Sequence, residues 1–402
     1  MQPGVVIVGG GQAGLEAAAG LRTQGYVGTV TLICEEPHAP YQRPPLSKEF
    51  LTGKQEIDRV FLRALAYYEK QRIDLILDQR VTEINPGAKL VHLSGGGTVP
   101  YAQLILAVGA RNRMLPAPGA ENVLYLRSLD EAVTLKQRLA EARHGVAVIG
   151  GGFIGLEAAA AARMAGKPVT VIEAAPRLMS RAVPPVLSDF FLDLHRAHGS
   201  EVLLNTVAVE VRPDSVLLEN GRRIAADLVV AGIGVIPNVE LAQTAGLGVN
   251  DGIMVDEYMR TIDPAIFAIG DCADHPNVFA GGRARIESVQ NAVDQAKCVA
   301  RVIMGRPEPY RDVPWFWTDQ FDVRFQMAGL SGAHDQFVLR GSIEARKFSV
   351  FYFKQGRLLA VDSVNRPGDH VTARKMLAAG TPLTTEQASD ETVDLKRLAA
   401  AG

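Results

Sequence analysis

Two stretches of the sequence carry glycines at a spacing that suits binding of a nucleotide diphosphate. Gly9–Gly14 and Gly150–Gly155 both read G-x-G-x-x-G, and they directly follow the apolar runs Val5–Val8 and Val146–Ile149. Glycine permits a tight strand-to-helix turn, lets a diphosphate touch the backbone and allows close helix packing. The following helix points N–H groups and its positive dipole end at the phosphates. The repeat therefore predicts two separate dinucleotide sites.

Acidic residues follow apolar runs at positions where they could bind a ribose or another diol. Glu35 lies 21 residues past the first glycine stretch, Glu173 lies 18 residues past the second, and Asp271 follows a third apolar run. A carboxylate that follows the second glycine stretch accepts a free 2′-hydroxyl and repels a 2′-phosphate, so Glu173 favours NADH over NADPH. Arg177 and Arg181 lie just beyond it and could serve a phosphate, which leaves NADPH open.

The elements that must position these residues alternate as strands and helices, which predicts an α/β fold with two Rossmann-like domains. Ser128 is the expected N-cap of a helix that reaches Ala142, with Glu131 completing a capping box. Alternating strands after residue 320 predict a C-terminal α+β domain built on an antiparallel sheet. The expected domains are 1–113 with 239–307, the inserted 114–238, and 308–402. The last dozen residues are small and polar and are expected to fray.

Bulk composition excludes several classes of function. The 402 residues are 47% hydrophobic with a formal net charge of -2, which argues against electrostatic binding of nucleic acid. No apolar run approaches the ~20 residues that span a bilayer. An apolar strand begins by residue 5, which leaves no room for a signal peptide. The three cysteines, Cys34, Cys272 and Cys298, form no C-x-x-C pair, and the expected location is the cytoplasm.

Several motifs together resemble the FAD-dependent pyridine nucleotide-disulfide oxidoreductases, over essentially the whole chain. They are Gly9–Gly14 with Glu35, the loop Arg43–Lys48 (R-P-P-L-S-K), Gly150–Glu157, and Ala268–Ala273. The Arg43–Lys48 loop is the most specific of them. It is similar to the branch of NADH-dependent ferredoxin reductases, which includes putidaredoxin reductase and the reductases of aromatic-ring dioxygenases. The implied architecture is that of glutathione reductase, with an FAD domain, an NAD domain and a C-terminal domain.

This resemblance also implies roles for individual residues. The residues matched to FAD contacts are Gly9, Gly11, Ala13, Gly14, Glu35, Arg43, Lys48, Val81, Arg127, Asp271, Val289 and Trp317. The residues assigned to the NAD site are Gly150, Gly152, Ile154, Gly155, Glu173 and Gly234. In the family, the lysine that matches Lys48 lies beside the flavin and pairs with the acid that matches Glu157. We therefore expect these two residues to act in catalysis by orienting the nicotinamide.

The route of the electrons after the flavin follows from what the Arg43–Lys48 loop lacks. Disulfide reductases of this superfamily carry a cysteine pair in that loop, and peroxidase and CoA-disulfide relatives carry one cysteine, whereas this loop has none. Transfer through a protein thiol is thereby excluded. The resemblance implies single-electron transfer to a small 2Fe–2S ferredoxin, which supplies a haem-thiolate monooxygenase or a ring-hydroxylating dioxygenase. Such ferredoxins are acidic, and residues 301–360 carry nine Lys or Arg against six Asp or Glu.

Two alternatives stay open at this point. The acceptor could be rubredoxin or another small species such as the ascorbyl radical. The chain could also be an interaction flavoprotein similar to apoptosis-inducing factor, with slow NADH oxidation.

Overall fold

The computed structural model describes residues 3–401, which form two compact units. The first unit contains the chain up to Gln42 together with Asp58–Arg111 and Ile236–Phe316. The second contains Arg43–Ile57, Asn112–Val235 and the chain from Trp317 onward. Each unit is therefore assembled from segments far apart in the sequence.

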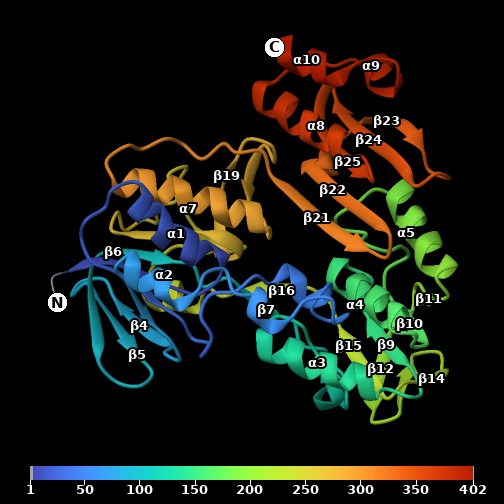
Figure 1. Ribbon diagram of the computed structural model, residues 1–402, viewed down its shortest axis with the longest axis horizontal. Coiled ribbons are helices and arrows are strands. Elements are labelled where there is room, and N and C mark those ends of the chain that lie inside the picture. The colour runs from blue at the N-terminus through green and yellow to red at the C-terminus, as the bar shows by residue number, and fades with distance from the viewer. Residues whose placement is uncertain (1–2, 402) are drawn as a thin grey trace. The chain divides into compact units, whose positions relative to one another are not determined.

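A parallel sheet forms the core of the first unit (Figure 1). Its strands run in the order β3 (Ile73–Ile76), β2 (Val30–Ile33), β1 (Gly4–Val8), β6 (Thr98–Leu106) and β18 (Ile266–Ala268). Strands β1, β2 and β18 are buried along their whole length, as is typical of a parallel sheet covered on both faces. The first residues of β6 pair with β5 (Leu90–Leu93), which pairs with β4 (Val81–Asn85), so that these two strands continue the sheet as antiparallel strands.

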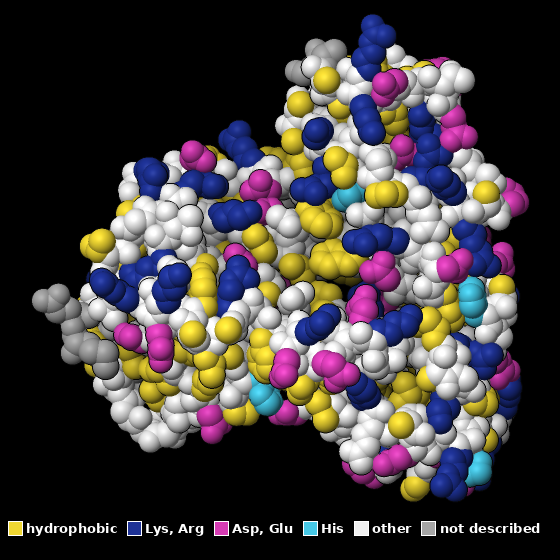
Figure 2. All heavy atoms as spheres, in the orientation of Figure 1, with side chains coloured by type: hydrophobic (Ala, Val, Ile, Leu, Met, Phe, Trp, Pro, Cys, Tyr) yellow, Lys and Arg dark blue, Asp and Glu magenta, His cyan; other side chains and the backbone are white. Residues whose placement is uncertain are grey.

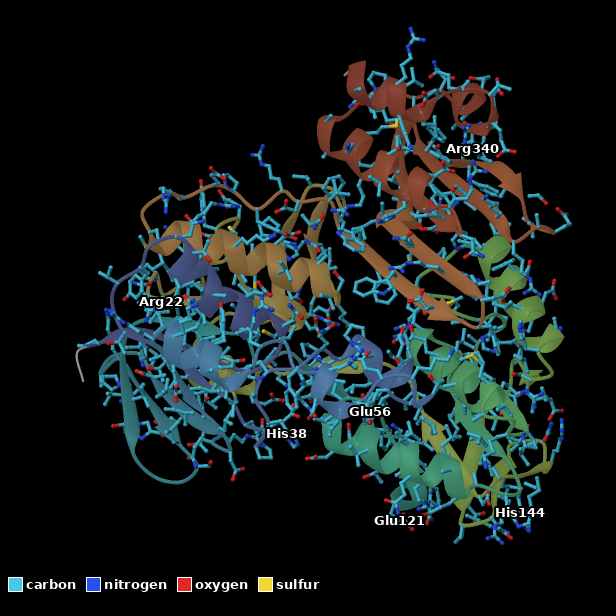
Figure 3. All side chains as sticks on the ribbon, in the orientation of Figure 1. Arg22, His38, Glu56, Glu121, His144 and Arg340 are labelled. Carbon is cyan, nitrogen blue, oxygen red and sulfur yellow. The ribbon has the colours of Figure 1, made fainter. Side chains whose placement is uncertain are left out.

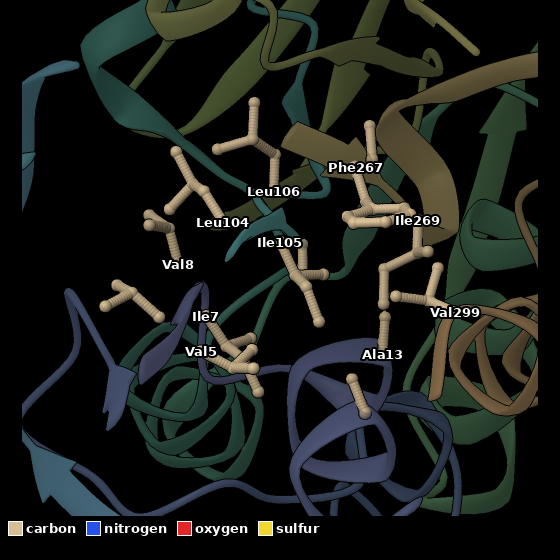
Figure 4. Packing of buried hydrophobic residues seen from close by; sticks show 14 of the residues in the cluster. Val5, Ile7, Val8, Ala13, Leu104, Ile105, Leu106, Phe267, Ile269 and Val299 are labelled. Carbon is tan, nitrogen blue, oxygen red and sulfur yellow. The ribbon is translucent and has the colours of Figure 1, made fainter. Parts of the chain in front are cut away.

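Helices α1 (Gln12–Thr23) and α7 (Val289–Ile303) lie side by side in this unit (Figure 1). Their close approach depends on Gly20, since a Cβ there would lie 3.2 Å from the Cβ of Ala300. Side chains from the sheet and from α7 meet in one apolar cluster, which contains Ile105, Phe267 and Val299 (Figure 4). The smaller elements are α2 (Leu65–Lys70), α6 (Glu240–Thr244), η2 (Ile57–Arg59), η4 (Gly270–Cys272), and the strands β17 (Ile253–Met254), β19 (Ala273–Asn277) and β20 (Gly282–Ala284).

The second unit contains a similar parallel sheet. Its strands run in the order β11 (Glu201–Leu203), β10 (Val169–Ile172), β9 (Val146–Ile149), β15 (Leu228–Ala231) and β8 (Val123–Leu124). Its helices are α3 (Leu129–Glu141), α4 (Phe153–Met164) and α5 (Pro185–Ala197). A meander of β12 (Ala208–Arg212), β13 (Ser215–Leu218) and β14 (Arg223–Ala225) precedes β15. The 3-10 turns of this unit are η1 (Pro44–Ser47) and η3 (Ala120–Asn122). Strand β7 (Ala110–Asn112) pairs with β16 (Val235–Pro237), and the chain passes from one unit to the other within these two strands.

A five-stranded sheet follows at the C-terminal end. Its order is β21 (Trp315–Gln320), β22 (Val323–Gly329), β25 (Arg357–Val364), β24 (Lys347–Lys354) and β23 (Gln336–Ser342), and the last four are antiparallel neighbours. Helices α8 (Pro367–Ala379), α9 (Thr385–Ser389) and α10 (Leu395–Ala401) contribute to the apolar cluster on one face. Helix α5 contacts the other face, with Phe190 and Phe191 edge-on to Phe348 and Phe325.

The predicted α/β fold with an antiparallel C-terminal sheet is confirmed, and so is the capping box of Ser128 with Glu131. The expectation of a frayed tail is wrong. Helix α10 buries Leu395, and the buried Arg340 donates to the backbone oxygen of Val393 at 2.9 Å (Figure 3). No helix within residues 3–401 is long and apolar enough to cross a membrane.

Candidate functional site

The first glycine stretch forms an open backbone surface at the start of α1. Gly9 has a φ of +117°, and a Cβ there would lie 2.2 Å from the oxygen of Ala107. A Cβ on Gly14 would lie 1.9 Å from the oxygen of Gly9, which enforces the close helix-to-strand approach. A Cβ on Gly11, the N-cap, would meet nothing within 4 Å, and no side chain caps the helix. This arrangement fits a diphosphate at the helix N-terminus.

Glu35 follows β2, at the same end of the sheet as the first glycine loop. Its side chain is 66% exposed, and its Oε1 lies 3.4 Å from Nη1 of Arg80, so the carboxylate is accessible to a ribose. Val81 comes next after Arg80 and has a buried side chain, which leaves its backbone as the part that an adenine could contact. Sequence reasoning did not include Arg80 in this group.

Asp271 lies in a turn that is held against the same loop. Gly270 has a φ of +77°, and a Cβ there would lie 3.1 Å from the Cβ of Ala13 in α1. The Gly270 N–H donates to the side-chain oxygen of Gln295 at 2.7 Å, and Gln295 is fully buried in α7. Val289 is the first residue of that helix. The structure thus brings Ala13 and the Asp271 turn together, as expected for two groups that hold one ligand.

Gln295 is a residue that sequence reasoning missed. Its amide nitrogen lies 3.2 Å from Nδ1 of His275, which is also fully buried. Burial lowers the pKa of His275 to about 4, so this imidazole is neutral near pH 7. A glutamine within a helical pattern is usually a surface residue, and the sequence contains no signal for its contact with a loop 25 residues away.

The second glycine stretch has the same construction as the first. Gly150 has a φ of +103°, with the oxygen of Gly232 2.5 Å from a Cβ at that position. Gly152 is the uncapped N-cap of α4, and a Cβ there would meet only the Gly232 oxygen, at 3.8 Å. A Cβ on Gly155 would lie 2.1 Å from the Gly150 oxygen. The exposed Ile154 follows the N-cap in the first turn. A second diphosphate fits this loop.

Glu173 is fixed at the edge of this second loop. Its Oε2 accepts the N–H of Gly151 at 2.5 Å, and its Oε1 accepts the N–H of Ala175 at 2.7 Å. Arg177 donates to Ser188 Oγ at 2.9 Å and to two backbone oxygens, so its guanidinium is already engaged within the fold. Only Arg181 of the two downstream arginines is exposed.

Arg181 lies beside a further residue of the predicted NAD site. A Cβ on Gly234, which has a φ of +100°, would lie 3.1 Å from its Nη2. Because this guanidinium is exposed, it is the cation that could reach a phosphate near Gly234.

Lys48 and Glu157 form a buried ion pair. The Lys48 ammonium lies 2.7 Å from Oε1 of Glu157, and the two side chains are 11% and 1% exposed. Thr318 donates its hydroxyl to the same oxygen at 2.5 Å, while Ser47 donates its hydroxyl to Oε2. The carboxylate therefore accepts one charged and two neutral hydrogen bonds, which is what a buried anion requires.

Glu157 does not lie in the first turn of α4. The helix begins at Phe153, so Glu157 is its fifth residue. The helix dipole acts mainly within the first turn. The helix dipole alone therefore does not explain why the Glu157 carboxylate is buried. The three hydrogen-bond donors to that carboxylate do explain it.

The remaining predicted contacts also lie in the second unit. Arg43 donates to the backbone oxygen of Arg127, whose N–H donates to Glu131 at 2.7 Å. Trp317 is a partly buried residue of β21, next to Thr318. These positions do not test the roles that the resemblance implied for Arg43, Arg127 and Trp317, so those roles stay predictions.

The three cysteines are free and buried, and none lies in the Arg43–Lys48 loop. Burial raises the pKa of Cys34 to about 12 and those of Cys272 and Cys298 to about 11. Thiols with such pKa values are poor nucleophiles near pH 7. No disulfide is formed within residues 3–401.

Comparisons with known proteins agree with this geometry. The pyridine nucleotide-disulphide oxidoreductase family matches residues 3–296, and the reductase C-terminal family matches residues 315–399. Rhodocoxin reductase of Rhodococcus erythropolis is 49% identical over 399 residues, which cover 98% of this chain and 93% of that protein. A solved ferredoxin reductase for the CYP199A2 system from Rhodopseudomonas palustris is 45% identical with a TM-score of 0.96, covering 99% of this chain and 100% of that one.

A second solved structure is the covalent putidaredoxin reductase–putidaredoxin complex. The matched chain is 40% identical with a TM-score of 0.96, over 100% of this chain and 99% of that one. The resemblance inferred from the glycine loops and the Arg43–Lys48 loop is thereby confirmed. The chain belongs to the pyridine nucleotide-disulphide oxidoreductase family, with rhodocoxin reductase and putidaredoxin reductase among its relatives.

Proposed function

We propose that this protein is an FAD-dependent reductase that takes hydride from NADH and passes electrons one at a time to a small 2Fe–2S ferredoxin serving an oxygenase. The observation that carries the proposal is the combination of two diphosphate-binding loops with a buried Lys48–Glu157 pair and an Arg43–Lys48 loop that contains no cysteine. The names of the relatives support it, since they are reductases of ferredoxin-type proteins and one was captured with putidaredoxin. We further place it in the cytoplasm, where three free cysteines stay reduced.

FAD binds at the first glycine loop in this proposal. The backbone around Gly11 holds the diphosphate, Glu35 the adenosine ribose, and Asp271 the ribityl chain, with Gln295 fixing the Asp271 turn. When bound, the flavin supplies the step from two-electron acceptance to single-electron release. Protein side chains need only bind, orient and exclude water, because no general base is required.

NADH binds at the second glycine loop. Gly152 lies where the diphosphate meets the start of α4, and Glu173 presents its carboxylate at the edge of the loop. That carboxylate repels a 2′-phosphate, so NADH is preferred to NADPH. Arg181 is the cation that could oppose this preference, since Arg177 is engaged within the fold.

The Lys48–Glu157 pair orients the nicotinamide while hydride leaves it. A buried ammonium held at 2.7 Å from a carboxylate has a fixed position, whereas a solvated lysine does not. If Glu157→Ala leaves the rate of NADH oxidation unchanged, this role is wrong. Glu201→Ala provides a matched control, since it breaks an exposed ion pair in the same unit.

The acceptor is tested by comparing reduction of a 2Fe–2S ferredoxin, rubredoxin, and cytochrome c without ferredoxin. We expect fast NADH-dependent reduction of the ferredoxin and much slower direct reduction of cytochrome c. Fast reduction of rubredoxin alone would replace the ferredoxin by the alternative acceptor. Slow NADH oxidation with every acceptor would favour an interaction role.

A further inference from the structure

A chain of hydrogen bonds leads from Glu157 to the buried side chain of His195 on α5. Thr318 donates to Glu157 at 2.5 Å, the amide nitrogen of Gln320 lies 3.3 Å from the Thr318 hydroxyl, and the Gln320 oxygen lies 2.9 Å from Nε2 of His195. Thr318, Gln320 and His195 are all fully buried. The chain joins α4, β21 and α5, three elements of the second unit that are separated in the sequence (Figure 1).

The chemistry of these groups fixes the direction of each hydrogen bond. An ionised Glu157 can only accept, so Thr318 uses its single hydrogen on the carboxylate and must accept from the amide of Gln320. The Gln320 oxygen is then left to accept, and His195 must carry its hydrogen on Nε2. Every donor in the chain consequently points toward the carboxylate, and hydrogen bonds aligned in this way polarise one another.

The far end of the chain is a neutral imidazole. Nδ1 of His195 is buried and has no hydrogen-bond partner among the described residues. Phe321 lies edge-on to its ring, with the centroids 5.1 Å apart, and the titratable group that acts on it is His198, the C-cap of α5. Burial lowers the pKa of His195 to about 4, which agrees with a single hydrogen, on Nε2, near pH 7.

We propose that Thr318, Gln320 and His195 are positioning residues that fix the carboxylate of Glu157 and, through it, the ammonium of Lys48. Buried polar groups are costly, and apolar side chains of similar shape would serve simple packing between β21 and α5 at lower cost. Oxygen Oε1 of Glu157 is shared by Lys48 and Thr318, so loss of the hydroxyl frees the carboxylate to turn away from the ammonium. The inference rests on the proposed role of the Lys48–Glu157 pair.

The direction of the chain can be tested without measuring activity. Holoenzyme labelled with ¹⁵N at its eight histidines gives ring-nitrogen shifts that report which nitrogen carries hydrogen, and His195→Phe identifies the His195 signals. We expect the neutral Nε2–H form between pH 6 and 8 in the wild type. An Nδ1–H form or a doubly protonated ring in that range would overturn the proposal.

The effect on the ion pair is tested with Thr318→Val, Thr318→Ser and the matched control Ser363→Ala. Ser363 is a buried hydroxyl of the same sheet that contacts Ser349, away from Glu157. We expect Thr318→Val to lower the rate constant of flavin reduction by saturating NADH about tenfold, with a less than twofold change in KM. Thr318→Ser should restore most of the rate, and Ser363→Ala should leave it unchanged.

Equal losses in Thr318→Val and Ser363→Ala would show a merely structural role and overturn the proposal, as would a full rate in Thr318→Val. Failure of the wild-type flavin to be reduced by NADH would instead contradict the proposed function. The histidine shifts would then still report the hydrogen-bond direction, so the two failures are distinguishable.

Discussion

At the scale of single residues, Glu157 is a buried carboxylate whose stability depends on its three hydrogen-bond donors, Lys48, Thr318 and Ser47. Lys48→Met would leave the carboxylate with two neutral hydroxyl donors, and breaking a buried pair from one side costs about 3–5 kcal/mol of unfolding free energy. Lys48→Met combined with Glu157→Gln should recover part of that loss, since an amide needs no counter-ion. Urea denaturation measures both changes.

Arg222→Met is the matched control for this prediction. It breaks an ion pair with Glu201 in which the side chains are 46% and 44% exposed, and such pairs contribute less than about 1 kcal/mol. Equal stabilities of Lys48→Met and Arg222→Met would contradict the account of the buried pair.

Glu173 should determine the choice of nicotinamide cofactor. We expect the wild type to have a kcat/KM for NADH at least about tenfold above that for NADPH, because the carboxylate repels a 2′-phosphate. Glu173→Ala should reduce this ratio, although it also removes the acceptor of the Gly151 N–H. Asp189→Ala, an exposed acid of the same unit, should leave the ratio unchanged. A wild-type preference for NADPH would show that Arg181 outweighs Glu173.

Some of these residues could be predicted from the sequence and others could not. The glycines, Glu35, Glu173 and Asp271 have fixed positions relative to a strand that precedes them, so local spacing predicts them. Thr318 and Gln295 act through contacts with residues 161 and 25 positions away, and no local pattern distinguishes them from ordinary polar residues. The Lys48–Glu157 pairing came from family resemblance rather than from spacing.

At the scale of elements, α10 differs most from the prediction. The last dozen residues are small and polar, which predicts a frayed end, yet Leu395 packs in the cluster with Phe351 and Met376. Leu395→Ala should lower the unfolding free energy by about 2–3 kcal/mol. The exposed neighbour Lys396→Ala should change it by no more than about 0.5 kcal/mol. Equal effects in urea denaturation would mean that α10 does not contribute to the core.

The C-terminal sheet also contains a buried carboxyl without a cation. Burial raises the pKa of Asp362 to about 7, and the Tyr352 hydroxyl donates to it at 2.9 Å. The folded state therefore keeps this proton up to about pH 7, whereas the unfolded chain loses it near pH ~4, so stability falls as pH rises between these values.

Asp362→Asn removes this titration while keeping an acceptor for Tyr352. The difference in stability between the variant and the wild type should shift in favour of the variant by about 2–3 kcal/mol between pH 5 and pH 8. Urea denaturation at both pH values measures this. Equal differences at pH 5 and pH 8 would show that Asp362 does not titrate in this range.

The apolar pattern of each segment explains which elements could be predicted from the sequence. Strand β9 was predicted to the residue because a buried parallel strand is a continuous apolar run. The meander β12–β14 was not predicted, because its strands are short. Helix α5 was not predicted either, although Leu187, Phe190 and Leu194 have the spacing of one buried helix face.

At the scale of the whole molecule, charge gives only weak guidance to the partner. Lys and Arg are interspersed with Asp and Glu on the face shown in Figure 2, and the formal net charge is -2. The excess of three basic residues within 301–360 is mild. A basic ferredoxin-docking face thus stays a prediction, and reduction rates that are insensitive to moderate salt would count against it.

The central claim is that hydride enters as a pair of electrons and that the electrons leave singly to a 2Fe–2S protein. The most direct test mixes the anaerobic holoenzyme with one equivalent of NADH and an excess of oxidised 2Fe–2S ferredoxin, and follows both by absorbance. The account predicts that two ferredoxins are reduced per NADH oxidised, with no loss after alkylation of accessible thiols, since all three cysteines are buried. NADH oxidation without ferredoxin reduction, or reduction abolished by alkylation, would contradict it.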